Sequence, residues 1–302
     1  AADLAQALKI AINSVYGLTA AKFTHQFKDP RNKDNIVAKR GALFMVNLKH
    51  EVQKRGFTVA HIKTDSIKIA DATPEIIDYV MKYGELYGYT FEHEATYDRM
   101  CLVNDAVYIA KYADGEHEFK LSTGEKIMTP WTATGTQFQI PYVFKKLFAK
   151  KELAFNDMCE TKSVTSTLYL DMNEEFCMEF GDKCDMHNYI FIGKVGRFCP
   201  IKIGCGGGVL YREKDGKYYA ATGSKGYRWL ESEMVEKLGK QDDIDHKFYI
   251  SLVDAAKETI QKYGDFEWFV SDDPYVGPMM IEGEYGLHPF YDEDVPFTGP
   301  TK

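Results

Sequence analysis

The stretch FTVAHIKTDSIKIA, residues 57–70, decides how the first part of the chain folds. Apolar, β-branched residues alternate with other residues on both sides of a short polar centre, Lys63-Thr64-Asp65-Ser66. Such alternation is typical of strands, and Asp and Ser are common residues of turns. The stretch therefore predicts a β-hairpin with the polar centre at its tip.

Helices are expected on both sides of this hairpin, because apolar residues recur at helical spacing and Thr73-Pro74-Glu75 is typical of a helix start. The expected helices cover residues 2–16, ended by Gly17, residues 35–55, ended by Gly56, and residues 73–87. Strands are expected next over residues 89–94, 106–112 and 118–121. This order of helices and strands predicts the α+β class.

The second half of the chain is expected to combine helices with a segment rich in β-structure. The expected helices cover residues 141–154, which are basic, and residues 226–239 and 245–263. Residues 189–219 are rich in Gly and aromatic residues, which predicts mostly strands. The tail after Asp272 is acidic and contains five prolines, so we expect it to be loosely ordered.

The 302-residue chain has a formal net charge of −8, but its basic residues are grouped. Residues 1–50 contain eight Lys and Arg against three Asp and Glu, and residues 190–230 contain eight against two. The last 38 residues contain nine acids and one base. Phosphate binding depends on local basic surface, so the two basic segments are candidates for contact with nucleic acid. Ordinary solvated faces remain the alternative for each segment.

The composition also indicates in which cellular compartment the chain is expected. No apolar run approaches the roughly 18 residues that a membrane span needs, so no membrane partner is expected. The six cysteines form no CxxC pair, and we find neither a signal peptide nor a glycosylation sequon, which favours the cytoplasm. The chain begins with Ala inside a helical pattern, so we expect it to be a fragment of a longer protein.

The first expected helix carries the residues that a triphosphate site needs. Lys9, Asn13 and Tyr16 are spaced i, i+4 and i+7, and therefore share one helix face. Lys neutralises phosphate oxygens, Asn donates hydrogen bonds to them, and an aromatic ring packs on a base pair. Residues 9–17 (KIAINSVYG) resemble the K-x-x-x-N-S-x-Y-G pattern of the fingers helix in family B DNA polymerases. The resemblance implies that these three residues bind the incoming dNTP.

The hairpin resembles the Y-G-D-T-D-S palm hairpin of the same family. The resemblance implies that Asp65 is a catalytic residue that binds Mg²⁺, with Lys63, Thr64 and Ser66 as its hairpin neighbours. A tight turn suits this task because it presents a carboxylate rigidly. Lys63 stands where the family usually has its first Asp, which is the less essential of the two. The implied reaction is attack of a primer 3′-OH on a dNTP, with pyrophosphate leaving, by a two-metal mechanism.

Expected contacts with DNA lie further along the chain. Residues 104–110 take the place of the family's K-K-R-Y primer motif, of which only Tyr108 remains. The expected primer and DNA-binding residues are Tyr108, Lys111, Lys145 and Lys146. A half-buried strand aromatic is the alternative for Tyr108. The resemblance is good over residues 1–112 and only positional beyond, where residues 189–229 resemble phage-type enzymes of the family.

The resemblance implies three parts. Residues 1–56 are expected to be the C-terminal part of the fingers, residues 57–125 the second half of the palm, and residues 126–302 a thumb with a C-terminal extension. The family's D-x-x-S-L-Y-P motif is not in this sequence, so one metal-binding carboxylate is missing. We therefore expect an incomplete active site, with primer–template DNA, dNTP and an N-terminal half bearing the exonuclease and first palm half as partners.

Other interpretations stay open. One is a non-catalytic DNA-binding module, or a subunit of a split polymerase. A nucleotide-cofactor enzyme using residues 204–208 fits poorly, because Val209 replaces the third glycine of G-x-G-x-x-G. A zinc site has only one short ligand spacing, Cys184 to His187. Its candidate ligands are Cys177, Cys184, His187, Cys199 and Cys205.

Overall fold

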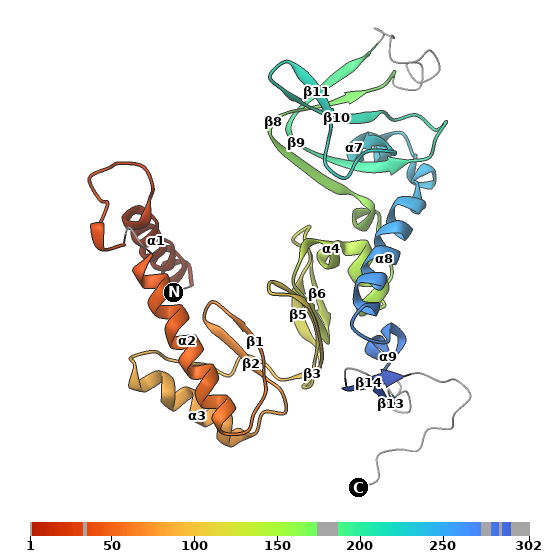
Figure 1. Ribbon diagram of the computed structural model, residues 1–302. Helices are drawn as coiled ribbons and strands as arrows, with labels where there is room; N and C mark the ends of the chain where they lie inside the picture. The colour runs from red at the N-terminus through yellow and green to blue at the C-terminus, as the bar shows by residue number, and fades with distance from the viewer. Residues whose placement is uncertain (1, 33–34, 174–186, 273–278, 284–285, 291–302) are drawn as a thin grey trace. The chain divides into compact units, whose positions relative to one another are not determined.

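The computed structural model describes residues 2–32, 35–173, 187–272, 279–283 and 286–290 (Figure 1). The chain is α+β, as predicted, and divides into two compact units, residues 1–95 and 96–302. The division falls inside the expected palm range 57–125, between the hairpin and the strand that carries Tyr108. No helix of the described residues is long and apolar enough to cross a membrane.

The described residues of the first unit form three α-helices, a short 3₁₀ helix and one hairpin. Its elements are α1 (Ala2–Ala20), η1 (Pro30–Asn32), α2 (Ile36–Lys54), β1 (Val59–Lys63), β2 (Ser66–Ile69) and α3 (Pro74–Leu86). The hairpin and all three expected helices are confirmed. The core joins α2 and α3, and its buried members are Met45, Leu48, Val52, Ile76, Val80 and Tyr83. Apolar residues of the hairpin pack against this core, which anchors the strands that lead to the tip.

Two details of the first unit differ from the sequence expectation. Helix α1 continues past Gly17 to Ala20, because Gly17 does not take the positive φ by which glycines end helices. Residues 89–94 form no strand. Instead, Tyr89 and Phe91 turn their rings onto Phe44 of α2, at centroid distances of 4.7 and 6.0 Å.

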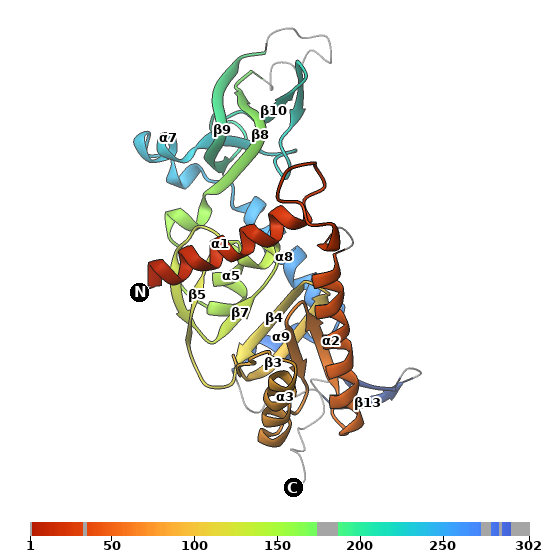
Figure 2. The same ribbon diagram turned by 90° about the vertical axis from the view of Figure 1, so that its left-hand side faces the viewer.

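One half of the second unit packs short strands against helices (Figures 1 and 2). Strands β3 (Tyr97–Asn104), β4 (Val107–Tyr112) and β7 (Trp131–Ala133) form one antiparallel sheet, and β5 (His117–Lys120) and β6 (Lys126–Thr129) another. The helical elements are α4 (Thr136–Gln139), α5 (Pro141–Phe144), η2 (Lys145–Ala149), η3 (Phe155–Met158), α8 (His246–Gln261) and α9 (Phe266–Val270). Their shared core includes fully buried Trp131, Phe138 and Phe144.

The other half of the second unit is a five-stranded antiparallel sheet in the order β11-β10-β8-β9-β12. Its elements are β8 (Glu160–Asp171), β9 (Tyr189–Ile201), β10 (Val209–Lys214), β11 (Lys217–Ala220) and β12 (Arg228–Glu231), followed by α7 (Ser232–Lys237) and η4 (Gln241–Asp243). The predicted strands between residues 189 and 219 are confirmed, and so is the helix at 245–263, which Asp245 caps. The core of this half surrounds Leu168, Leu210 and Trp229.

Three expectations for the second unit need correction. The helix predicted over 141–154 ends at Ala149, because Lys150 takes a left-handed φ of 48°. The helix predicted over 226–239 begins only at Ser232, since Arg228–Glu231 pairs with β9 and buries Trp229. In the acidic tail, β13 (Met279–Gly283) pairs with β14 (Gly286–Phe290). The other residues after Asp272 lie outside the described residues.

Candidate nucleotide and metal site

The β1–β2 hairpin presents Asp65 at its tip. Lys63 pairs with Ser66, so Thr64 and Asp65 form a two-residue loop. The Ser66 hydroxyl donates a hydrogen bond to the Lys63 carbonyl at 3.2 Å and closes the turn. Thr64 has a left-handed φ of 53°, which β-branched residues rarely adopt, so the loop holds backbone strain beside the carboxylate.

The two faces of the hairpin differ in chemistry. Ile62 pairs with Ile67 on the face that packs against the core of α2 and α3. The other face carries His61 opposite Lys68, next to Lys63. Burial lowers the pKa of Lys68, Glu94 opposes this shift, and the Lys63 charge adds to it. Asp65 therefore lies at the end of a face that carries two lysines.

His61 and Lys68 are the residues of this hairpin that the sequence analysis missed. The signal that would have found them is the period-two alternation, which assigns both to the same face as Lys63. The observed pairing adds that His61 and Lys68 lie directly opposite each other.

The carboxylates of the described residues do not complete a two-metal site. Such a site needs carboxylates that bridge two ions about 3.5–4 Å apart. In the part of the chain that the structure describes, no group of three or more His, Cys, Asp or Glu side chains is placed to hold a metal ion. Asp65 at an exposed tip fits as one Mg²⁺ ligand.

Helix α1 presents the three dNTP candidates to solvent. Lys9, Asn13 and Tyr16 are all exposed and lie on one helix face. Among the described residues, none of the three side chains has a hydrogen-bond or ion-pair partner, and none is bonded to Asp65. The arrangement leaves an ammonium, an amide and a phenol ring available to a ligand on one side of the helix.

A second face of α1 is apolar and exposed. Its residues follow helical spacing, and more than half of each side chain's surface is accessible; they are Leu4, Leu8, Ile12 and Val15. A contiguous exposed apolar stripe marks a site of interaction with another protein segment. Helix α1 therefore combines a polar, ligand-ready face with an apolar face that no described residue covers.

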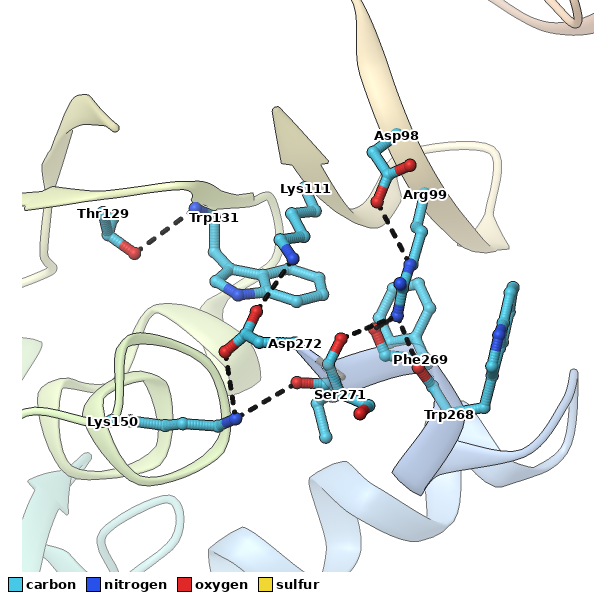
Figure 3. Close-up of polar contacts among 11 residues, drawn as sticks. Asp98, Arg99, Lys111, Thr129, Trp131, Lys150, Trp268, Phe269, Ser271 and Asp272 are labelled. Atoms are coloured by element: carbon cyan, nitrogen blue, oxygen red, sulfur yellow. Dashed lines mark hydrogen bonds and ion pairs between the residues drawn. The ribbon is translucent and has the colours of Figure 1, made fainter. Parts of the chain in front are cut away.

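Two of the expected primer contacts, Tyr108 and Lys111, are already engaged within the protein. Tyr108 is half-buried on β4, with its ring 6.3 Å from that of Tyr97. Lys111 Nζ contacts Asp272 Oδ1 at 2.8 Å, and Lys150 Nζ contacts the other Asp272 oxygen at 3.3 Å (Figure 3). The hydrogen bond from Lys111 lowers the pKa of Asp272, with help from Lys150.

Arg99, which the sequence analysis also missed, fixes the chain just before Asp272. Its guanidinium Nη1 donates hydrogen bonds to the carbonyls of Trp268 and Ser271, at 2.6 and 2.9 Å (Figure 3). These bonds satisfy carbonyls at the C-terminal end of α9, which a helix leaves without intrahelical partners. The contact joins residues about 170 positions apart, so no local sequence pattern predicts it.

The structure does not support the expected DNA contact of Lys145. Its side chain is only 5% exposed, with Nζ 2.9 Å from Asp157 and 3.0 Å from Glu125. Burial alone would lower the pKa of Lys145, but hydrogen bonds to these two carboxylates outweigh burial and raise it. The ammonium is thus committed to a buried charge cluster, whereas the neighbouring Lys146 lies on the surface.

The candidate zinc ligands lie only partly within the described residues. Cys177 and Cys184 lie outside the described residues. Cys199 is fully buried, with its sulfur 3.5 Å from that of Cys159. His187 contacts Asp171 through Nδ1.

No protein-family model matches the chain, and no curated protein matches it, so the residues and their placement alone support a functional proposal.

Proposed function

We propose that this chain is the C-terminal part of a DNA polymerase similar to family B, and that it acts together with an N-terminal half. One observation carries the proposal. An exposed face of α1 groups Lys9, Asn13 and Tyr16, and the hairpin that follows along the chain presents Asp65 at its tip. Residue types, order and local geometry all agree with the fingers helix and palm hairpin that the sequence resembles.

In the complete enzyme, each of these groups has a distinct task. Lys9 neutralises the triphosphate, Asn13 donates hydrogen bonds to it, and Tyr16 packs on the nascent base pair. Asp65 supplies one carboxylate for Mg²⁺, which neutralises charge on the transferred phosphate when it is bound. Because the sequence lacks the D-x-x-S-L-Y-P carboxylate of the family that it resembles, we propose that the chain alone provides nucleotide and DNA contacts without a complete catalytic centre.

The apolar face of α1 supports the requirement for an N-terminal half. An amphipathic helix gains most of its stability from burying its apolar face. The stripe from Leu4 to Val15 is long enough to accept a second helix, and burying four large side chains would contribute roughly 1.5–3 kcal/mol for each. A helix of the N-terminal half is the partner that the proposal assigns to this stripe.

A DNA-binding subunit without catalysis is the second candidate. The polar hairpin face favours it, because Lys63 and Lys68 beside Asp65 suit phosphate better than a divalent cation. The two candidates differ in whether Asp65 takes part in chemistry. Both share the expectation that the chain binds DNA.

The test joins the chain to its N-terminal half and replaces Asp65 by Asn. We expect primer extension to fall by roughly 100- to 1,000-fold, because a metal ligand contributes several kcal/mol to charge stabilisation. Binding of primer–template, measured by fluorescence anisotropy, should change by less than about twofold, since one exposed charge adds little to affinity.

Asp71→Asn is the matched control. Asp71 lies just beyond β2, is exposed, and has a left-handed φ of 49° that Asn tolerates well. The change removes the same charge from the same hairpin and should leave extension intact. If Asp65→Asn proves no more damaging than Asp71→Asn, Asp65 has no catalytic role and the DNA-binding subunit becomes the better description.

A further inference from the structure

Two cysteines face each other across strands β8 and β9. The register of these strands pairs Glu160 with Phe198, so Cys159, the residue just before β8, lies opposite Cys199. Both are free thiols, and their sulfur atoms are 3.5 Å apart although the residues are 40 positions apart in the chain. Both side chains belong to the core of this half and are only 4% and 0% exposed.

The backbone at this position can accommodate a disulfide between the two strands. Directly opposite residues of an antiparallel pair have Cα atoms about 4.5 or 5.5 Å apart, and disulfides join Cα atoms about 4.4–6.8 Å apart. The sulfur atoms would have to close from 3.5 Å to a bond length of about 2.05 Å. Rotation about the Cα–Cβ bonds can supply this movement, so the strands keep their register.

The two thiols differ in acidity. The Sγ–H of Cys159 donates a hydrogen bond to the Phe155 carbonyl at 3.3 Å, so Cys199 is the donor between the two sulfurs. That hydrogen bond from Cys199 lowers the pKa of Cys159 and outweighs burial, and the Arg197 charge also lowers it. The contact with Cys159, together with burial, raises the pKa of Cys199. Because the thiolate is the reactive form of cysteine, Cys159 is the thiol that reacts first.

A cavity lies beside the thiol pair. It has a volume of about 350 Å³, and its lining includes Thr161 and Arg197, which are paired with each other. Side chains two positions apart point to the same side of a strand, so this pair follows Cys159 and Cys199 on the same side of the sheet. A hydrogen bond to the Asn156 carbonyl at 3.0 Å holds the Arg197 guanidinium in place. The cavity gives a small polar oxidant a route toward sulfurs that are covered from bulk solvent.

We propose that Cys159 and Cys199 form a reversible disulfide when the chain meets hydrogen peroxide. The Cys159 thiolate attacks one peroxide oxygen, the O–O bond breaks, and the released hydroxide takes up a proton and leaves as water. The Cys199 sulfur then attacks the sulfur of the Cys159 sulfenic acid, the S–O bond breaks, and the hydroxide takes the Cys199 proton and leaves as a second water. The thiol pair is oxidised, the peroxide is reduced to water, and a dithiol reductant restores both thiols. This reaction is independent of the proposed polymerase function.

Peptide mapping locates the disulfide. The reduced full chain is treated with a small excess of hydrogen peroxide, the remaining thiols are blocked with N-ethylmaleimide in denaturant, and the digested protein is analysed by mass spectrometry. We expect a peptide in which Cys159 is linked to Cys199, and we expect dithiothreitol to remove it. Cys101 of β3 is the internal control, because it is also buried, at 7% exposure, but burial raises its pKa to about 11. It should remain a thiol and be blocked.

Single substitutions separate the roles of the two thiols. Cys199→Ser keeps a hydrogen-bond donor beside Cys159 but removes the second sulfur, so Cys159 should accumulate sulfenic acid, which dimedone traps. Cys159→Ser should leave Cys199 unmodified. Arg197→Gln should slow disulfide formation by roughly threefold or more, because the thiolate fraction of Cys159 falls. Thermal unfolding of each variant checks that the sheet is intact.

The wild-type chain decides the outcome even if a variant fails to fold. Its oxidised form should also unfold at a higher temperature than its reduced form, because a link between residues 40 positions apart constrains the unfolded chain. Blocking of both Cys159 and Cys199 by N-ethylmaleimide after peroxide treatment would overturn the inference. A disulfide from either of them to a different cysteine, or dimedone labelling of Cys199 in Cys159→Ser, would also overturn it.

Discussion

At the residue scale, the tip of the β1–β2 hairpin places a cation two positions from a carboxylate. Asp65 lies in the loop, while Lys63 lies on the polar strand face, where its charge acts on Lys68. A lysine that close would compete with Mg²⁺ for the carboxylate if it turned toward it. Its place beside Lys68 favours a role toward phosphate or solvent instead.

This placement gives a prediction for Lys63→Asp in the chain joined to its N-terminal half. We expect primer extension to fall far less than in Asp65→Asn, with at most a shift in the Mg²⁺ optimum, because the substitution introduces the carboxylate that the family B palm hairpin, which this hairpin resembles, carries at this position. Steady-state extension over a Mg²⁺ titration measures both effects. Loss of activity as large as in Asp65→Asn would mean that Lys63 acts directly on the triphosphate.

Local residue chemistry explains what could be predicted at this scale. Asp65 at the tip and the shared face of Lys9, Asn13 and Tyr16 follow from turn and helix spacing, which involve only near neighbours. The burial of Lys145 could not be predicted, because its partners Glu125 and Asp157 are 20 and 12 positions away. Without knowledge of these two partners, a basic stretch predicts an exposed helix face.

At the element scale, the segment that follows α5 depends on that buried charge cluster. Lys145 starts η2, and its ammonium joins the loop at Glu125 to η3 at Asp157, whose side chain is 1% exposed. Asp157 also accepts a hydrogen bond from the Ala154 amide at 2.7 Å. The first residue of η2 is therefore fixed to two other segments.

We predict that Lys145→Met lowers the free energy of unfolding by about 3–5 kcal/mol, because it leaves the Asp157 charge buried without a partner. Urea denaturation measures the change. The raised pKa of Lys145 means that its contribution is fully present below the pKa of an unfolded lysine, near 10.4, and is lost as pH rises through the folded value.

Lys146→Met provides the comparison, since it removes the same charge from the adjacent, exposed position. It should change stability by no more than about 0.5 kcal/mol. Equal effects of the two substitutions would show that the cluster does not stabilise the fold.

Elements with a strong local period were predicted well, and elements defined by distant pairing were not. Helices α2, α3 and α8 show apolar spacing and caps in the sequence itself. Strand β12 was taken for a helix, because only its pairing with β9 reveals it and buries Trp229. Strands β3 and β8 were missed for the same reason, since both are defined by partners across the sheet.

At the scale of the whole molecule, the sequence predicted the fold class better than the domain boundaries. The α+β class follows from the order of local patterns, but the division at residue 95 does not coincide with any expected domain limit. It lies where Tyr89 and Phe91 complete the aromatic packing on α2, a tertiary contact that no local pattern indicates. Grouped charges, by contrast, are visible in the sequence of both units and make these segments candidates for contact with DNA.

The proposed function requires that this chain binds DNA but lacks part of the catalytic centre. The most direct measurement titrates the purified chain into labelled primer–template at several salt concentrations, and then adds Mg²⁺ and dNTPs to the same mixture. We predict binding that weakens steeply with salt, because phosphate contacts release counterions, and no template-directed extension. Absence of binding, affinity that does not change with salt, or extension of the primer by the chain alone would contradict the account.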